Sequence, residues 1–258
     1  MELFQDLKLG LERYYLWLYL GWRDVYRRYL RSFLGPSWLF INSLVLVSVM
    51  GPLYSFLFKI PMANYLGYMI TSILTWQTVA QIFNDMPTVY INNSGFITDV
   101  NLPFSVYHLQ MLWRNFVIYC NSLIIILPIT FFSHLWNWQS VLLFPVNLFL
   151  VAANGLFISY LVAALGTRFR DILPIMGSVV QIAFFATPII WKKDMLGAHA
   201  YLTDFNPFFH MLEMLRAPFL GYVPGLMSYL VLSTTALLGL LLTMLSYRRI
   251  SPRVAYWL

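Results

Sequence analysis

The stretch of sequence that decides the fold runs from Asn115 to Thr167 and reads NFVIYCNSLIIILPITFFSHLWNWQSVLLFPVNLFLVAANGLFISYLVAALGT. Its 53 residues include no Lys, Arg, Asp or Glu. A helix needs about 20 apolar residues to cross the hydrocarbon core of a bilayer, so this stretch is too long for one crossing and suits two. The polar, turn-prone segment from Ser133 to Ser140 is the natural place to divide it. The sequence therefore predicts two membrane spans joined by a short turn.

Four more charge-free stretches flank this one, and each is long enough to supply a further span. They are Ser32 to Phe58, Ile60 to Asn84, Ile172 to Trp191 and Ala217 to Tyr247. The six spans are predicted at residues 37–58, 65–84, 111–132, 141–165, 173–191 and 225–246. We therefore expect an all-α integral membrane protein whose six transmembrane helices occupy residues 34–247.

The composition agrees with this prediction and excludes several classes of protein. Hydrophobic residues make up 60% of the 258-residue chain and charged residues 10%, whereas soluble domains carry about 25% charged residues. A soluble enzyme, a disordered tail and a disulfide scaffold are excluded. Cys120 is the single cysteine, so the chain can hold neither an intrachain disulfide nor a cysteine-rich metal site.

Lys and Arg predict the orientation, because the cytoplasmic loops of membrane proteins are enriched in both. With the N-terminus inside, twelve of the 16 basic residues fall on the cytoplasmic side, and the other four are Lys59, Lys192, Lys193 and Arg216. We expect a multi-pass protein of the cytoplasmic (inner) membrane with both termini in the cytoplasm. The formal net charge of +6 is then explained without a nucleic-acid partner.

The ends of the chain are expected to lie on the cytoplasmic side. Residues 1–33 predict an interfacial amphipathic helix, because Asp24, Arg27, Arg28 and Arg31 recur at helical spacing. A plain positive-inside anchor is the alternative, and both interpretations can hold together. Residues 248–258 are expected to form a cytoplasmic tail.

The cytoplasmic loop at residues 85–104 is longer than topology needs and is bracketed by prolines. A short helix from about Thr88 to Asn93, ended by Gly95, agrees with the rules for helix ends. Such a helix would offer Tyr90 and Ile91 to a partner protein. The alternative is an ordinary solvated loop.

The extracytoplasmic insert at residues 192–224 contains a second short helix. Asn206 can cap it, and Pro207 suits its first position. About three apolar turns are too short to cross a bilayer but long enough to enter it and return, so we predict short re-entrant helices. His210, Glu213 and Arg216 share one stripe, and the last two are expected to pair. A helix lying on the surface is the alternative.

Several kinds of chemistry are missing from the sequence. It has no glycine-rich loop ending in Gly-Lys-Ser/Thr, so ATP cannot be bound by that route and any such energy must come from a partner. The four histidines are too scattered for a metal site, and no catalytic constellation is found. The spans embed no Asp, Glu or His, and this absence disfavours an ion-coupled transporter. Arg114 lies at the inner end of one span, where its side chain is expected to snorkel to the membrane surface.

Aromatic residues are abundant, with nine Trp, seventeen Tyr and twenty-one Phe. Flat aromatic faces can bind the apolar C–H faces of sugar rings without trapping them by charge. The candidates in or near the spans are Trp38, Phe40, Tyr54, Phe184, Phe185 and Trp191. Packing against lipid is the alternative for any one of them.

Four segments, taken in order, resemble one known family. Residues 23–38 read RDVYRRYLRSFLGPSW and look like the approach to the first span in type-2 ABC transporter permeases that export polysaccharides. Residues 93–103 resemble the family's coupling segment, and residues 168–171 resemble its Phe-Arg-Asp turn. Thr187 to Trp191, Asn206-Pro207 and the segment from Arg216 to Gly221 resemble its outer region. Asn101-Leu102-Pro103-Phe104 departs from the family, whose members often carry Pro-Arg there.

The resemblance implies a homodimer of six-span subunits, paired with two copies of an ATP-binding cassette ATPase subunit that binds ATP and Mg. The cargo would be lipid-linked O-antigen, capsular or teichoic polymer. Tyr90, Ile91, Asn93 and Phe96 would couple the chain to the ATPase. A permease for a small drug or lipid, and an ATP-independent channel or scaffold, remain alternatives.

Three further groups of residues are expected to have roles in such an exporter. Arg27, Arg28 and Arg31 would guide the diphosphate of a lipid carrier, since guanidinium groups suit phosphate geometry. His210, Glu213 and Arg216 would belong to an extracytoplasmic gate. The aromatic candidates would line a channel between the two subunits. The chain itself is expected to be neither an enzyme nor a metal binder.

Overall fold

The computed structural model describes residues 2–29, 37–100, 102–132 and 137–258, and these ranges are helical without any strand. The side chains of Trp38 and Phe40, and all of Arg31, lie outside what is described. The helices are α1 Leu3–Glu12, α2 Tyr14–Tyr29, α3 Ser37–Phe58, α4 Met62–Asp85, η1 Met86–Thr88, α5 Val89–Asn92, α6 Ser94–Asp99, α7 Phe104–Phe132, α8 Trp138–Arg168, α9 Ile172–Ala186, η2 Lys193–Phe205, α10 Pro207–Arg216, η3 Ala217–Phe219 and α11 Leu226–Trp257.

A helix lies at each of the six positions where a span is predicted. Within the described ranges, α7, α8 and α11 are long and apolar enough to cross a membrane, and α3 and α9 contain shorter apolar helices. The predicted bounds need correction at three ends. α7 begins at residue 104 rather than 111, and α11 continues to residue 257, so the predicted tail at 248–258 is largely helix. α9 ends at Ala186 rather than at 191, because Pro188 disfavours helical backbone at the residue before it.

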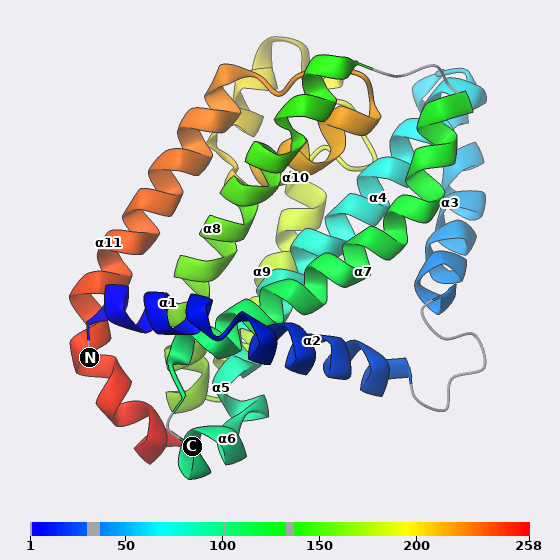
Figure 1. The fold of residues 1–258 in the computed structure, drawn as a ribbon. Helices are drawn as coiled ribbons and strands as arrows, with labels where there is room; N and C mark the ends of the chain where they lie inside the picture. The colour runs from blue at the N-terminus through cyan, green and yellow to red at the C-terminus, as the bar shows by residue number, and fades with distance from the viewer. Residues whose placement is uncertain (1, 30–36, 101, 133–136) are drawn as a thin grey trace.

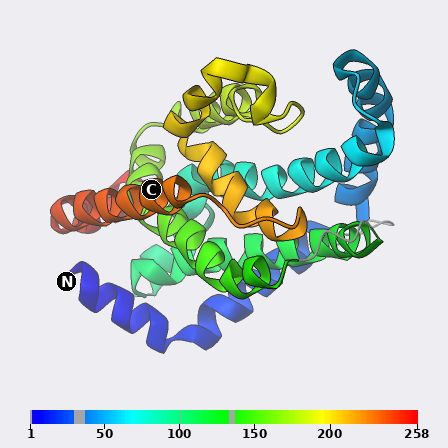
Figure 2. The ribbon, with the colours of Figure 1, turned by 90° about the horizontal axis from the view of Figure 1, so that it is seen from above.

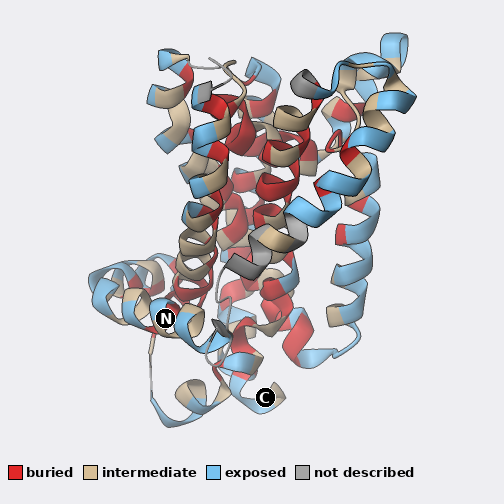
Figure 3. Ribbon diagram, turned by 90° about the vertical axis from the view of Figure 1, so that its right-hand side faces the viewer, coloured by how far each residue is buried: buried red, intermediate tan, exposed pale blue. Residues whose placement is uncertain are grey.

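The long helices form a bundle, and α1 and α2 run across its lower end (Figure 1). Seen from above, α8 and α11 lie side by side, and α3 stands at one edge (Figure 2). The predicted single helix at residues 1–33 is two helices, interrupted at Arg13. Buried residues are concentrated where the helices face one another (Figure 3). The short helix α10 lies inside this core against α4, α8 and α11.

Buried amides join the helices of the core. On α8, the Asn147 side chain donates to the Met214 carbonyl at 3.1 Å, and the Asn154 side chain donates to the Leu232 carbonyl at 2.9 Å. Tyr229 on α11 donates back to Asn147 at 2.9 Å. Such bonds help to hold helices together in a membrane, because an apolar side chain gains little by contacting another helix instead of lipid.

Candidate functional site

A cavity of about 620 Å³ lies between α9, η2 and α10, and we call it the α9–α10 cavity. Among the described residues that line it, none is Asp, Glu, Lys or Arg. Its larger lining side chains are Val179, Ile182, Trp191, Leu202, Phe205 and Phe208. This wall is apolar and partly aromatic, which is the surface that the hypothesis of sugar stacking requires.

The structure brings three of the aromatic candidates together next to this cavity. The ring centroids of Phe184 and Phe185 are 5.3 Å apart, and the Trp191 indole donates to the Phe185 carbonyl at 3.4 Å. Phe185 is 68% exposed, whereas Phe184 turns inward and its ring lies 6.1 Å from that of Trp76. Of these three described residues, Phe185 is exposed and Trp191, which is half-buried, lines the cavity.

Tyr54 is not part of this group. It lies on α3, where its ring is 5.4 Å from that of Phe58. Both general views place α3 at one edge of the protein, apart from α9 (Figures 1 and 2). A single chain therefore does not bring Tyr54 to the α9–α10 cavity.

The helix α10 is enclosed by α4, α8 and α11. Asn206 caps it as predicted, since its side-chain oxygen accepts from the Phe208 amide at 3.0 Å. His210 is fully buried and bonds to the Ser228 hydroxyl at 2.8 Å and the Asp204 carbonyl at 2.9 Å. His210 is thus held apart from the Glu213–Arg216 pair with which it was grouped.

The expected pair of Glu213 and Arg216 is present, with 2.9 Å between Arg216 Nη2 and Glu213 Oε2. Arg216 is only 3% exposed, and its Nη1 also donates to the Pro188 carbonyl at 2.6 Å. The same nitrogen donates to the Tyr68 and Ser72 hydroxyls at 3.0 and 3.1 Å. Arg216 therefore joins α10 to α4 and to the segment after α9.

The coupling segment differs from the single helix that was predicted. It consists of η1, α5 and α6, and Gly95 lies within α6 instead of ending a helix. Asn93 interrupts the helical path, and its side chain folds back to donate to the Val89 carbonyl at 2.9 Å. The Phe96 ring lies 5.6 Å from the Arg23 guanidinium of α2. The exposed part of the segment is Asn92, Gly95, Thr98, Asp99 and Val100, which we call the coupling face.

Tyr90 is 2% exposed, so the prediction that it is offered to a partner is wrong; Ile91 is half-buried. The Tyr90 hydroxyl lies 2.8 Å from His108 Nε2, and His108 Nδ1 lies 2.7 Å from the Ser159 hydroxyl. Burial raises the pKa of Tyr90 well above its ordinary value, so the phenol stays protonated. A chain of hydrogen bonds therefore runs from α5 through α7 to α8.

Arg27 and Arg28 are exposed in the last turn of α2, where both can reach a phosphate group. Asp24 lies one turn before them on the same helix, and sequence reasoning missed its partners on α7. Asp24 accepts from Gln110 at 2.6 Å and lies 3.5 Å from Arg114.

Arg114 does not snorkel, because two carboxylates hold it inside the protein. Its Nη2 lies 2.6 Å from Asp85, whose oxygens also accept from Asn115 at 2.9 Å and Gln81 at 2.7 Å. The cluster ties α2, α4 and α7 together at one point. Asp85 directly follows a predicted span, and its distance in sequence from Arg114 concealed the pairing.

Asp6 is a second residue that sequence reasoning missed, and it is fully buried. Its carboxylate accepts from the backbone amides of Phe104 at 2.7 Å and Ser105 at 2.9 Å, at the start of α7. The Tyr160 hydroxyl donates to it at 2.9 Å. A carboxylate at a helix N-terminus satisfies backbone donors that have no partner within the helix, so Asp6 fixes α1 to α7.

Comparisons with known proteins agree on one family. Residues 15–220 match the ABC-2 type transporter family. The chain is similar to the O-antigen export system permease protein RfbA of Myxococcus xanthus, at 24% identity over 200 residues that cover 76% of this chain and 77% of the relative. Two proteins of the same name from Klebsiella pneumoniae are 23% and 22% identical over 229 and 227 residues, which cover 86% of this chain and 85% of each relative.

Proposed function

The chain belongs to the ABC-2 type transporter family, and from this premise we propose that it is the permease of an ATP-driven exporter of lipid-linked polysaccharide. Six of its helices cross the cytoplasmic membrane, and both termini lie in the cytoplasm. Two copies form a homodimer around the channel. Two copies of a separate ATPase subunit bind and hydrolyse ATP with Mg.

The observation that carries this proposal is the similarity to export permeases over most of the length of both chains. The α9–α10 cavity supports it, because a wall without charged side chains suits a polymer that must be held weakly at many points. A cargo recognised by a few strong charges would stall there.

The channel is completed by the second copy. On α9, the residues Ile175, Val179, Ile182 and Phe185 recur at helical spacing, and all four are exposed in the single chain. Exposed apolar side chains also run along α3, where Val45, Val49, Leu53 and Phe56 form a stripe. A partner chain can bring α3 against α9, which would place Tyr54 beside the aromatic group on α9. Trp38 and Phe40 precede Tyr54 by 16 and 14 residues, so they would belong to the opposite end of the channel.

Coupling to the ATPase uses the coupling face rather than Tyr90 itself. A partner that pushes on Thr98 or Asp99 displaces α6, and Asn93 passes the displacement to α5. The hydrogen bonds from Tyr90 through His108 to Ser159 then transmit it to the long helices α7 and α8. Ile91 and Phe96 serve as apolar contacts that keep the segment rigid.

The basic residues and the buried pair have separate tasks in this proposal. Arg27, Arg28 and Arg31 attract the diphosphate of the lipid carrier at the cytoplasmic surface, where guanidinium groups bind phosphate well. Arg216 and Glu213 hold α10 in place at the extracytoplasmic gate, and His210 anchors the same helix to α11 through Ser228.

The test is to delete the gene in its host and restore it on a plasmid. Deletion is expected to remove polymer from the cell surface while lipid-linked polymer accumulates inside, as seen by gel electrophoresis of the two fractions. The restored chain, carrying an affinity tag, is expected to purify together with an ATPase. Normal surface polymer in the deletion strain would contradict the proposal and favour the alternative, a permease for a small drug or lipid. Polymer transport without any co-purifying ATPase would favour the other alternative, an ATP-independent channel.

A further inference from the structure

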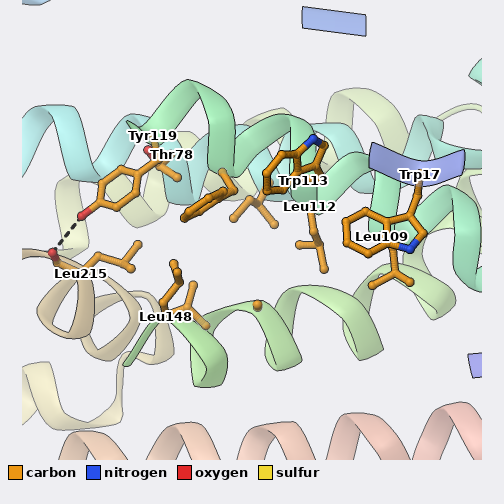
Figure 4. A pocket seen from close by; sticks show the side chains of 12 residues that line it. Trp17, Thr78, Leu109, Leu112, Trp113, Tyr119, Leu148 and Leu215 are labelled. Carbon is orange, nitrogen blue, oxygen red and sulfur yellow. Dashed lines mark hydrogen bonds between the residues drawn. The ribbon is translucent and has the colours of Figure 1, made fainter. Parts of the chain in front are cut away.

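A second cavity, of about 260 Å³, lies between α2, α4, α7 and α8 and reaches the end of α10. Trp17 of α2 stands at one end of it, and Tyr119 and Leu215 stand at the other (Figure 4). Among the residues described, it shares no lining side chain with the α9–α10 cavity. It is therefore separate from the site proposed for the polymer.

The length of this cavity matches one leaflet of a bilayer. Its wall on α7 is formed by Leu109, Leu112, Trp113, Phe116 and Tyr119, which recur on one face of the helix. At 1.5 Å per residue, the ten steps from Leu109 to Tyr119 span about 15 Å. The hydrocarbon core of a bilayer is about 30 Å thick, so one leaflet contributes about 15 Å.

The chemistry of the wall fits a hydrocarbon chain. Leu148, Val151 and Ala152 of α8 face the α7 wall, and the Tyr119 hydroxyl is already used by the Leu215 carbonyl at 3.0 Å. An apolar cavity of about 150 Å³ in a protein core stays dry and binds apolar ligands, and this cavity is larger.

The end of the cavity at α2 has a different character. Trp17 and Trp113 line this end. Their indole N–H groups are buried, and neither finds an acceptor in the part of the chain that the structure describes. Their rings are 6.2 Å apart, so the two donors belong to the same end. Buried indole N–H groups normally have a partner, and an ester oxygen at the level of the membrane interface would supply one.

Positive charge continues from this end. Beyond Trp17, α2 carries Arg23, Arg27 and Arg28 and only one acid, Asp24, which is already held by Gln110 and Arg114. Arg23 lies six residues from Trp17, or about 9 Å along the helix. This charge complements the phosphate of a lipid headgroup.

We propose that this cavity binds one acyl chain of a phospholipid from the cytoplasmic leaflet. The ester of the lipid lies at the end of the cavity formed by Trp17 and Trp113, its phosphate lies on the side of Arg23, and its chain extends between α7 and α8 toward Leu215. The lipid fastens the interfacial helix to the bundle. It is a resident component of the transporter and not its cargo.

The test uses phosphatidylglycerol with a diazirine in the middle of one acyl chain, added to membranes that hold the protein. After illumination, mass spectrometry is expected to find labelled peptides from residues 109–119 of α7 and 148–152 of α8. Ala152→Phe, which fills the cavity, is expected to remove this labelling. Ala153→Phe is the matched control, because Ala153 does not line the cavity, and it should be labelled like the unchanged protein.

Three results would overturn the proposal. The first is the absence of label in these peptides, and the second is equal labelling of the unchanged protein and Ala152→Phe. The third is loss of the label on addition of unlabelled polyprenyl diphosphate, which would assign the cavity to the tail of the cargo. If Ala152→Phe does not accumulate in the membrane, Leu148→Trp fills the same space and takes its place.

Discussion

Replacing Arg216 by Met is expected to destabilise the protein by about 3 to 5 kcal/mol, the usual cost of removing one partner from a buried ion pair. Both side chains of the pair are largely buried: that of Arg216 is 4% exposed, and that of Glu213 is 13% exposed. Methionine has a similar length but no donor. It would leave the Glu213 carboxylate without its cation and the Pro188 carbonyl without the donor at 2.6 Å.

A double-mutant cycle separates the ion pair from the other contacts of Arg216. Glu213→Gln removes the charge on the opposite side, and the double variant leaves no uncompensated carboxylate. We expect the double variant to cost less than the sum of the two single variants, with a coupling energy of about 1 to 3 kcal/mol. The free energy of unfolding is measured by titration with sodium dodecyl sulfate in mixed micelles, followed by tryptophan fluorescence.

The control is Arg170→Met, because Arg170 is exposed at the turn before α9 and is expected to change stability by less than about 0.5 kcal/mol. Two outcomes would refute the reasoning. One is additivity of the Arg216 and Glu213 substitutions within experimental error. The other is an Arg216→Met variant as stable as Arg170→Met, which would mean that the buried network does not hold α10.

Four further substitutions test other parts of the structure. Asp85→Asn keeps the shape of the side chain but removes the charge that faces Arg114, and it is expected to cost about 1.5 to 3 kcal/mol in the same unfolding assay; a stable variant would contradict this. Gly166→Ala places a methyl group within 2.8 Å of the backbone of the coupling segment, so stability and export should both fall. Gly177→Ala meets nothing within 4 Å and should leave stability unchanged or raise it by up to about 1 kcal/mol. Phe185→Ala should leave the free energy of unfolding unchanged, since the ring is 68% exposed. If the ring stacks on sugar, polymer export should fall by about twofold to tenfold. Normal export would indicate that this ring packs against lipid.

The positions of the helices could be predicted from the sequence because an apolar segment of membrane length is a local property. The predicted spans at 37–58 and 65–84 differ from α3 and α4 by no more than three residues at any end. The cap at Asn206 and the pair of Glu213 with Arg216 were equally accessible, since each involves residues within one helical turn. In each case the partners are neighbours along the chain, so spacing alone identifies them.

The tertiary structure decided which distant residues meet. Asp85 and Arg114 lie on different helices, and Asp6 reaches a helix start almost a hundred residues away. Tyr90 was predicted to be offered to a partner by a short helix in a cytoplasmic loop, yet it is buried, and His108 of α7 is its hydrogen-bond partner. Hydropathy fixes where a helix forms, but a buried polar group takes whichever partner the packing of helices brings within hydrogen-bond distance. For this protein, the sequence alone determined the helical membrane architecture, and the contacts that join the coupling segment, α2 and α10 to the bundle were decided only by how the helices pack.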